Sequence, residues 1–208
     1  MPSPILLGGN SMTEYDICNT ALAYIGQTET ITDYTSNTTA SALCGRLYPI
    51  AYKNLMEEYP WSFAVKTATL TAVTDGISEE YSFVYEYPSD CLRILKLIPC
   101  PDGQVIDYEV QYTLDGTTDV KRIFCDLEDA KVVYIMDIDN PSQFTNSFAD
   151  ALAWDLAVRL AIPLSADEKT IQMVQQFRQM AVSKAKLLNA KEQRKPINRP
   201  NRYIEARG

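Results

Sequence analysis

The spacing of apolar residues changes twice along this chain, and this change restricts the folds that the chain can adopt. Apolar residues recur at helical spacing up to Tyr59, alternate with polar residues from Lys66 to about Ile138, and return to helical spacing at Thr145. Pro60 should end the first helical stretch, because proline biases the residue before it away from helical backbone angles. The order predicts an α+β protein: an antiparallel bundle of four main helices with an inserted antiparallel β-sandwich or open-barrel module of about six strands.

The same patterns predict where the parts of the chain begin and end. We expect a flexible leader at 1–12, N-terminal helices at 13–64, the β module at 65–140, C-terminal helices at 141–195 and a basic extended tail at 196–208. The first residues lack the basic segment and the long apolar core of a secretory signal. No apolar run approaches the roughly 20 residues that a membrane-spanning helix needs, so no membrane association is expected.

Individual residues should mark the helix ends. Gly26 is expected to stop the first helix, and Ser36 or Asn37 to cap the second. Pro49 should kink or divide that second helix, because proline lacks an N–H group and its ring clashes with the preceding turn. Two pairs have capping-box spacing and should begin the third and fourth helices: Ser147 with Asp150, and Ser165 with Glu168.

The third helix, beginning near Thr145, is apolar around most of its circumference and should therefore be central and buried. Its one polar row contains Asp155 and Arg159, which can pair at i,i+4. The fourth helix should bury a single face: Ile171, Val174, Phe177, Ala181, Ala185 and Leu188.

The clearest alternation in the β region lies at 105–114. The side chains expected on its buried face are Ile106, Tyr108, Val110 and Tyr112, with Asp107, Glu109 and Gln111 facing solvent.

The stretch EYPWSFA stands where helical spacing gives way to alternation. Pro60, Trp61 and Phe63 are expected to anchor the β module on the helices, with Trp154 of the third helix packing nearby. The interpretation rests on the size of these rings, since a buried tryptophan contributes more contact area than any other side chain.

The formal charge of −8 is distributed unevenly, because residues 184–208 hold eight Lys/Arg against two acids while the remainder holds 25 acids against 11 Lys/Arg. An acidic body with a basic tail favours docking of the tail on a partner. The candidate residues for contact with such a protein partner are Lys191, Arg194, Lys195, Arg199, Arg202, Tyr203 and Arg207. Binding of the tail to nucleic acid and a simply solvated tail remain open.

The sequence offers little that could perform catalysis. It contains no histidine, which removes the usual general base and the commonest metal ligand, and it has no phosphate-binding loop. The best acidic cluster comprises Asp126, Glu128, Asp129, Asp137 and Asp139, which lack the glycine and glutamate of a calcium loop. We therefore expect no catalytic, metal-binding or cofactor-binding residues and no enzymatic activity, although a metal-dependent hydrolase using Asp137 or Asp139 is a remaining alternative.

The five cysteines are odd in number and never in CxxC spacing. With no secretory signal they are expected to be reduced, mostly buried thiols: Cys18, Cys44, Cys91, Cys100 and Cys125.

Four segments in a fixed order resemble the tail tubular protein A family, the head-to-tail adaptors of short-tailed bacteriophages. The segments are an N-x-A-L-x-x-I-G helix at 19–26, a P-W-x-F-A junction at 60–64, a P-x-D-C-L-R turn at 88–93 and an F-x-x-A-L-A-x-x-L-A helix at 148–157. Each motif consists mainly of packing residues, so the resemblance depends on their shared order across residues 13 to 190.

The resemblance implies a structural protein of the virion neck that is made in the bacterial host cytoplasm. It implies a ring of about twelve copies beneath the portal protein, with the basic tail contacting the portal protein or a neighbouring subunit. The ring would contact a nozzle protein like tail tubular protein B, and genomic DNA would pass through its lumen without sequence-specific binding. A lumen lined with carboxylates would repel phosphate groups and let DNA slide. The alternative function is a DNA-binding or packaging accessory protein that uses its basic C-terminal tail.

Overall fold

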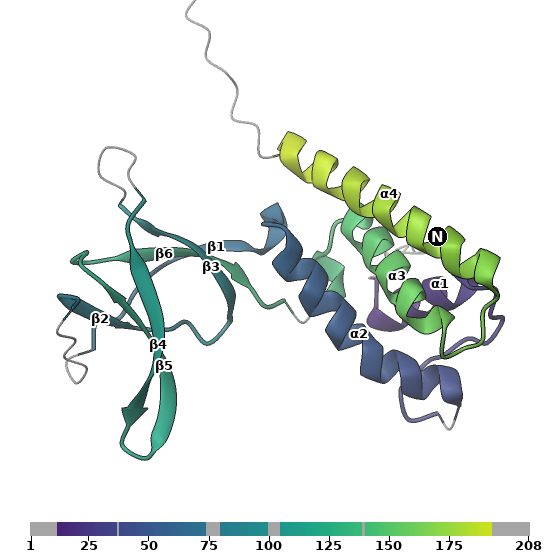
Figure 1. Cartoon of the computed structure of the whole chain (residues 1–208), viewed down its shortest axis with the longest axis horizontal. Helices are drawn as coiled ribbons and strands as arrows, with labels where there is room; N and C mark the ends of the chain where they lie inside the picture. Colours follow the sequence, from purple (N-terminus) through teal and green to yellow (C-terminus); the bar gives the residue numbers. More distant parts are fainter. Residues whose placement is uncertain (1–11, 37, 74–79, 100–104, 139, 193–208) are drawn as a thin grey trace, which may run out of the picture.

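The computed structural model describes residues 12–36, 38–73, 80–99, 105–138 and 140–192. Four helices pack together at one end of the molecule: α1 (Glu14–Tyr24), α2 (Thr39–Glu58), α3 (Asn146–Ala161) and α4 (Glu168–Glu192). Six strands between α2 and α3 in the chain lie at the other end (Figure 1). The mixed α+β class with an inserted β region is therefore confirmed. Among the described helices, none has the length and apolar character needed to cross a membrane.

The N-terminal helices begin and end at residues with recognisable capping geometry. Thr13 and Asp16 form a reciprocal capping box at the start of α1, and Gly26 stops that helix at φ +79°. The side chain of Thr38 caps α2, so the predicted cap at Ser36 or Asn37 is wrong for Ser36, and Asn37 lies outside the described residues.

Pro49 lies inside α2, which continues without a break from Thr39 to Glu58, so the predicted division of this helix does not occur. An internal proline costs about 3 kcal/mol in a helix. Residues on both sides of Pro49 are buried against the other helices, among them Tyr48 and Ala51. This packing holds the helix together across the missing hydrogen bond.

The C-terminal helices are capped by side chains other than those predicted. The Phe148 amide donates to the side chain of Thr145 at 3.3 Å, so Thr145, not the Ser147/Asp150 pair, caps α3. Asp167 accepts from the Thr170 amide at 2.7 Å at the start of α4.

The predicted capping box of Ser165 with Glu168 is also wrong. Ser165 has φ +59° and therefore lies in a turn ahead of the helix, where its side chain is not the cap. A capping residue normally has an extended backbone, whereas the backbone of Ser165 is left-handed.

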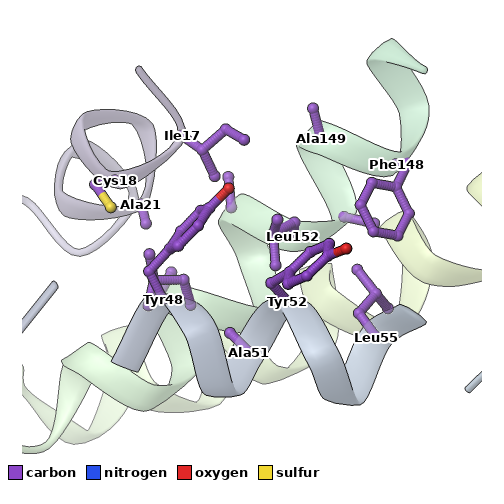
Figure 2. Packing of buried hydrophobic residues seen from close by; sticks show 14 of the residues in the cluster. Ile17, Cys18, Ala21, Tyr48, Ala51, Tyr52, Leu55, Phe148, Ala149 and Leu152 are labelled. Atoms are coloured by element: carbon purple, nitrogen blue, oxygen red, sulfur yellow. The ribbon is translucent and has the colours of Figure 1, made fainter. Parts of the chain in front are cut away.

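The helical core centres on α3, which packs against α1, α2 and α4. Phe148, Leu152, Leu156 and Leu160 are fully buried, as the sequence predicted for a helix apolar around most of its circumference. Figure 2 shows one face of α2, formed by Tyr48, Ala51, Tyr52 and Leu55. This face points toward Ile17 and Ala21 of α1 and toward Phe148, Ala149 and Leu152 of α3.

The β module consists of two three-stranded antiparallel sheets. The first has the order β1 (Val65–Thr69), β6 (Lys131–Met136), β3 (Cys91–Ile98). The second has the order β2 (Phe83–Glu86), β5 (Thr118–Cys125), β4 (Tyr108–Asp115). Both sheets contribute to one apolar cluster, with Leu97 and Val132 from the first and Tyr85 and Ile123 from the second. The number of strands agrees with the prediction, but the predicted six-stranded sandwich or open barrel is not confirmed, because the described strands form two separate three-stranded sheets and no closed sheet.

Two predicted buried faces are only partly buried. In β4 the side chain of Tyr108 packs against the module core, whereas Val110 and Tyr112 are exposed. In α4 the predicted core residues Phe177 and Leu188 are exposed as well, although Val174, Ala181 and Ala185 are buried as expected.

Candidate interaction surfaces and the junction that supports them

The junction between helices and β module is built around Trp61, which is 1% exposed. Its indole N–H donates to the Leu55 carbonyl at 2.8 Å, which satisfies the only polar group of the ring. The ring makes edge contacts with Tyr59 and Phe148 at centroid distances of 5.1 and 5.0 Å. Phe63 meets the same Phe148 ring at 5.0 Å.

The α4 residue Asn189 holds the junction from the other side. Its side-chain oxygen accepts from the Ser62 amide at 2.7 Å, and its side-chain nitrogen donates to the Pro60 carbonyl at 3.5 Å. Asn189 is buried, so these bonds replace water for both the amide side chain and the backbone. Sequence reasoning missed Asn189, although a polar residue one turn after Ala185 on the buried face of α4 was a signal.

The predicted anchors therefore divide into two groups. Pro60, Trp61 and Phe63 come together at the junction. Trp154 makes its ring contacts elsewhere, stacked on Tyr24 at 3.7 Å and on Phe177 at 5.0 Å. Trp154 was predicted to pack beside the junction, but its ring contacts are with α1 and α4, because its position on α3 faces those two helices.

The helical core reaches into the β module through β6 and the segment that follows it. Ile135 and Ile138 belong to the same buried cluster as Trp61. Tyr52 of α2 donates to the Asp137 carboxylate at 3.0 Å and accepts from the Ile138 amide at 2.7 Å. Packing and hydrogen bonds thus fix the β module to the bundle.

A buried carboxylate connects α3 with α4. Asp155 accepts from Arg159 Nε and from Arg178 Nε, each at 2.8 Å, so the predicted i,i+4 pair with Arg159 is confirmed. Arg178 also contacts Glu58 at 3.0 Å, and Lys186 contacts the other oxygen of Glu58 at 2.8 Å. Sequence reasoning missed Arg178, Glu58 and Lys186, because it had no means to bring α2 and α4 together.

The acidic cluster considered for metal binding is distributed among separate contacts. Asp137 pairs with Tyr52 and with Lys53, and Asp126 accepts from the Ser82 amide at 2.9 Å, which lowers the pKa of the Asp126 carboxyl. Asp129 lies in a turn with φ +52°. Asp139 is outside the described residues, and among the described ones no group of three potential metal ligands comes together.

Within the described part of the chain the cysteines are free thiols. Cys18, Cys44 and Cys125 are buried and Cys91 is half-buried, while Cys100 is not described. Burial raises the pKa of the Cys125 thiol, which keeps it protonated and weakly nucleophilic near neutral pH.

Tyr24 provides a pH-dependent contact between α1 and α3. Its hydroxyl donates to Asp150 at 2.8 Å, and burial together with the Asp150 carboxylate raises the Tyr24 pKa to about 12. The folded state holds this proton more tightly than the unfolded chain, whose phenol pKa is about 10. The contact therefore contributes its full stability below the unfolded pKa, and this contribution is lost as the pH rises through the folded pKa.

Burial also raises the pKa of Tyr34, Tyr48 and Tyr87, so we expect several late-ionising phenols in an ultraviolet titration of the wild type and one fewer in Tyr24→Phe. Asp150→Asn should move the ionisation back toward the ordinary value, since it removes the negative charge beside the phenol. Difference spectra with no late component would show that the Tyr24 contact does not form.

The candidate basic interface is represented in the structure by Lys191, which is exposed at the end of α4. The other predicted members lie outside the described residues: Arg194, Lys195, Arg199, Arg202, Tyr203 and Arg207.

Two apolar surfaces missed by sequence reasoning stand out beyond the cores. The first, called the α4 stripe, comprises Met173, Phe177, Met180, Leu187 and Leu188, all exposed on one side of α4. The second, called the hairpin arm, comprises Val110, Tyr112 and Leu114 of β4, of which Tyr112 is 66% and Leu114 72% exposed. Exposed large apolar side chains gathered on one face are typical of protein contact surfaces.

No known family model matches the chain, and no curated protein is similar enough to it to count as a relative.

Proposed function

We propose that this protein is a structural connector, a head-to-tail adaptor of a short-tailed bacteriophage. Copies of it form a ring that joins the portal protein to the tail nozzle and continues the DNA channel in the virion neck. The observation that carries this proposal is the pair of exposed apolar surfaces, the α4 stripe and the hairpin arm, on a protein whose own cores are already filled.

The contacts between the β module and the helical bundle support a structural role. The Trp61 contacts, the Asn189 hydrogen bonds and the Tyr52 hydrogen bonds fix the β module on the helical bundle at three places. A connector must hold its contact surfaces at a fixed separation. These contacts join the β module, which carries the hairpin arm, to the helical bundle, which carries the α4 stripe. The order of motifs shared with the tail tubular protein A family supports the same function.

The charge distribution supports the proposed environment. The chain is acidic apart from its C-terminal 25 residues, so a channel formed by its body would repel the phosphate groups of passing DNA. The basic segment that begins near Lys191 provides a contact of opposite charge for the portal protein or for a neighbouring copy.

Mass determination of the purified protein, alone and with the portal protein of the same phage, tests the proposal. We expect a ring-sized species when the portal protein is present, because the portal surface brings many copies to high local concentration. Removing residues 196–208 should weaken attachment to the portal. A protein that shows no association with the portal protein under any of these conditions would contradict the adaptor function.

The alternative, a DNA-binding or packaging accessory protein, rests on the basic tail and makes a different prediction. Duplex affinity would fall steeply with salt and would disappear when residues 191–208 are removed. The adaptor predicts weak duplex binding by the full chain, because its acidic body repels the phosphate backbone.

A further inference from the structure

The hairpin formed by β4 and β5 extends beyond the end of β2, the third strand of the same sheet. β2 pairs with β5 only from Arg122 to Cys125, whereas β4 follows β5 through the whole hairpin to Asp115 opposite Thr118. The outer half is therefore two-stranded, and it projects from the β module on the side away from α4 (Figure 1).

One face of this hairpin continues the core of the module outward. Residues directly opposite each other on antiparallel strands share a face, so Val110 lies beside the buried Ile123, and Tyr112 beside Lys121. Leu114, beside Asp119, completes the row near the turn. The Lys121 ammonium lies 5.6 Å from the Tyr112 ring centroid. The alternation that predicted a buried face is thus real, but within the described residues the chain provides nothing that buries its outer half.

The α4 stripe is the second uncovered apolar surface, and it contains a row of lysines. Lys169, Lys184 and Lys191 lie at helical spacing among its apolar side chains, and none of them makes an ion pair with a described residue. On the face of the hairpin arm, Asp119 lies opposite Leu114 and makes no ion pair with a described residue, whereas Lys121 lies over the Tyr112 ring; Glu109 and Asp115 are on the other face. The two surfaces are therefore apolar at their centres, and the unpaired Asp119 near the hairpin turn is opposite in charge to the lysine row.

We infer that the hairpin arm of one copy docks on the α4 stripe of a second copy of this chain. Leu114 and Tyr112 pack among Met180, Leu187 and Leu188, and Asp119 approaches Lys184. This inference rests on the self-assembly in the proposed function and names the two surfaces that carry it. Because the two surfaces lie at opposite ends of one molecule, each copy can bind two neighbours head to tail, which is the arrangement that forms a ring or a filament.

Charge argues against a symmetric contact between two α4 stripes. Such a contact would bring the two lysine rows together, so like charges would meet. The chain's own tail is also a poor cover for the α4 stripe, since 193–208 holds five Lys/Arg against one acid. The hairpin arm of another copy, with Asp119 near its turn, fits the lysine row better than either a second α4 stripe or the chain's own tail.

Leu114→Asp disables the hairpin arm, and Met180→Asp disables the α4 stripe. Both side chains are exposed, so each variant should fold as the wild type does. We expect either substitution to weaken the concentration-dependent association seen by sedimentation velocity at least about ten-fold. The matched controls are Gln111→Asp on the opposite hairpin face and Gln179→Asp on another side of α4, which add the same charge and should associate as the wild type does.

Mixing the two variants gives the decisive result. A Met180→Asp copy keeps its hairpin arm and a Leu114→Asp copy keeps its α4 stripe, so the mixture should form a one-to-one complex that neither variant forms alone. Both variants associating as the wild type does would overturn the inference. So would a mixture that stays monomeric, an effect confined to one variant, or a wild type that stays monomeric at about 0.1 mM.

The proposed function is tested separately by the same proteins. If rings form on the portal protein while the mixture gives no one-to-one complex, the adaptor function stands and the assigned surfaces are wrong. If the one-to-one complex forms and the portal protein is not bound, the surfaces stand and the adaptor function fails.

Discussion

Trp61→Ala is expected to lower the free energy of unfolding by about 3–5 kcal/mol, the usual cost of truncating a fully buried large aromatic side chain. Trp61 is 1% exposed and contacts the rings of Tyr59 and Phe148, so its removal leaves a cavity where the chain passes from helices to strands. The Leu55 carbonyl also loses the indole N–H that bonds it at 2.8 Å. Denaturant unfolding followed by circular dichroism measures the loss.

Two matched variants separate the parts of this effect. Trp61→Phe keeps a ring in the cavity but removes the hydrogen bond to Leu55, and it should cost about 1–2 kcal/mol from the unpaired carbonyl and the smaller ring. Trp154→Ala removes the other tryptophan, which is only half-buried, and should cost less than Trp61→Ala. A loss below about 0.5 kcal/mol for Trp61→Ala would contradict its role as the anchor of the junction.

The sequence predicted those parts of the fold that depend on contacts between residues close together along the chain. The rows of α3 follow helical spacing, and the i,i+4 pair of Asp155 with Arg159 follows from that spacing alone. Gly26 could be placed because the stop of a helix depends on a few backbone angles near it. The change of period at Pro60 marked the junction for the same reason.

The caps were displaced because neighbouring polar residues compete for the same backbone amides. Ser165 and Asp167 both precede α4, and spacing alone favoured Ser165. The turn places Ser165 at φ +59° and leaves Asp167 to accept from Thr170. Such choices depend on how the preceding loop approaches the helix, which local spacing does not contain.

The partners of the candidate surfaces could not be read from the sequence, because burial depends on elements far away in the chain. Val110 and Tyr112 alternate as a buried face should, yet both side chains are exposed. Phe177 has core spacing in α4, and Trp154 of α3 stacks on one side of its ring, yet the side chain remains 41% exposed. In both cases the pattern gave the face correctly, and the structure shows which part of it lacks a neighbour.

Asp155→Ala is expected to lower the free energy of unfolding by about 2–3 kcal/mol. Removing one member of a buried ion pair typically costs about 3–5 kcal/mol, because the remaining charge loses its partner without regaining water. Here the loss should be smaller, since the side chains of Arg159 and Arg178 are 29% and 31% exposed and can recover part of their hydration. Asp115→Ala is the matched control, because that carboxylate is 66% exposed in its pair with Arg122 and should contribute at most about 1 kcal/mol.

A double-mutant cycle shows whether the Asp155 effect arises from its link between α3 and α4. Arg178→Ala removes the α4 partner, and we expect a coupling energy with Asp155→Ala of about 1–3 kcal/mol. The same cycle between Asp155 and Lys186 should give a smaller coupling, since Lys186 contacts Glu58 and not Asp155. Zero coupling with Arg178 would mean that the Asp155 effect reflects only its i,i+4 pair within α3. Coupling of the expected size would mean that this buried carboxylate fixes α4, and with it the α4 stripe, against the central helix of the bundle.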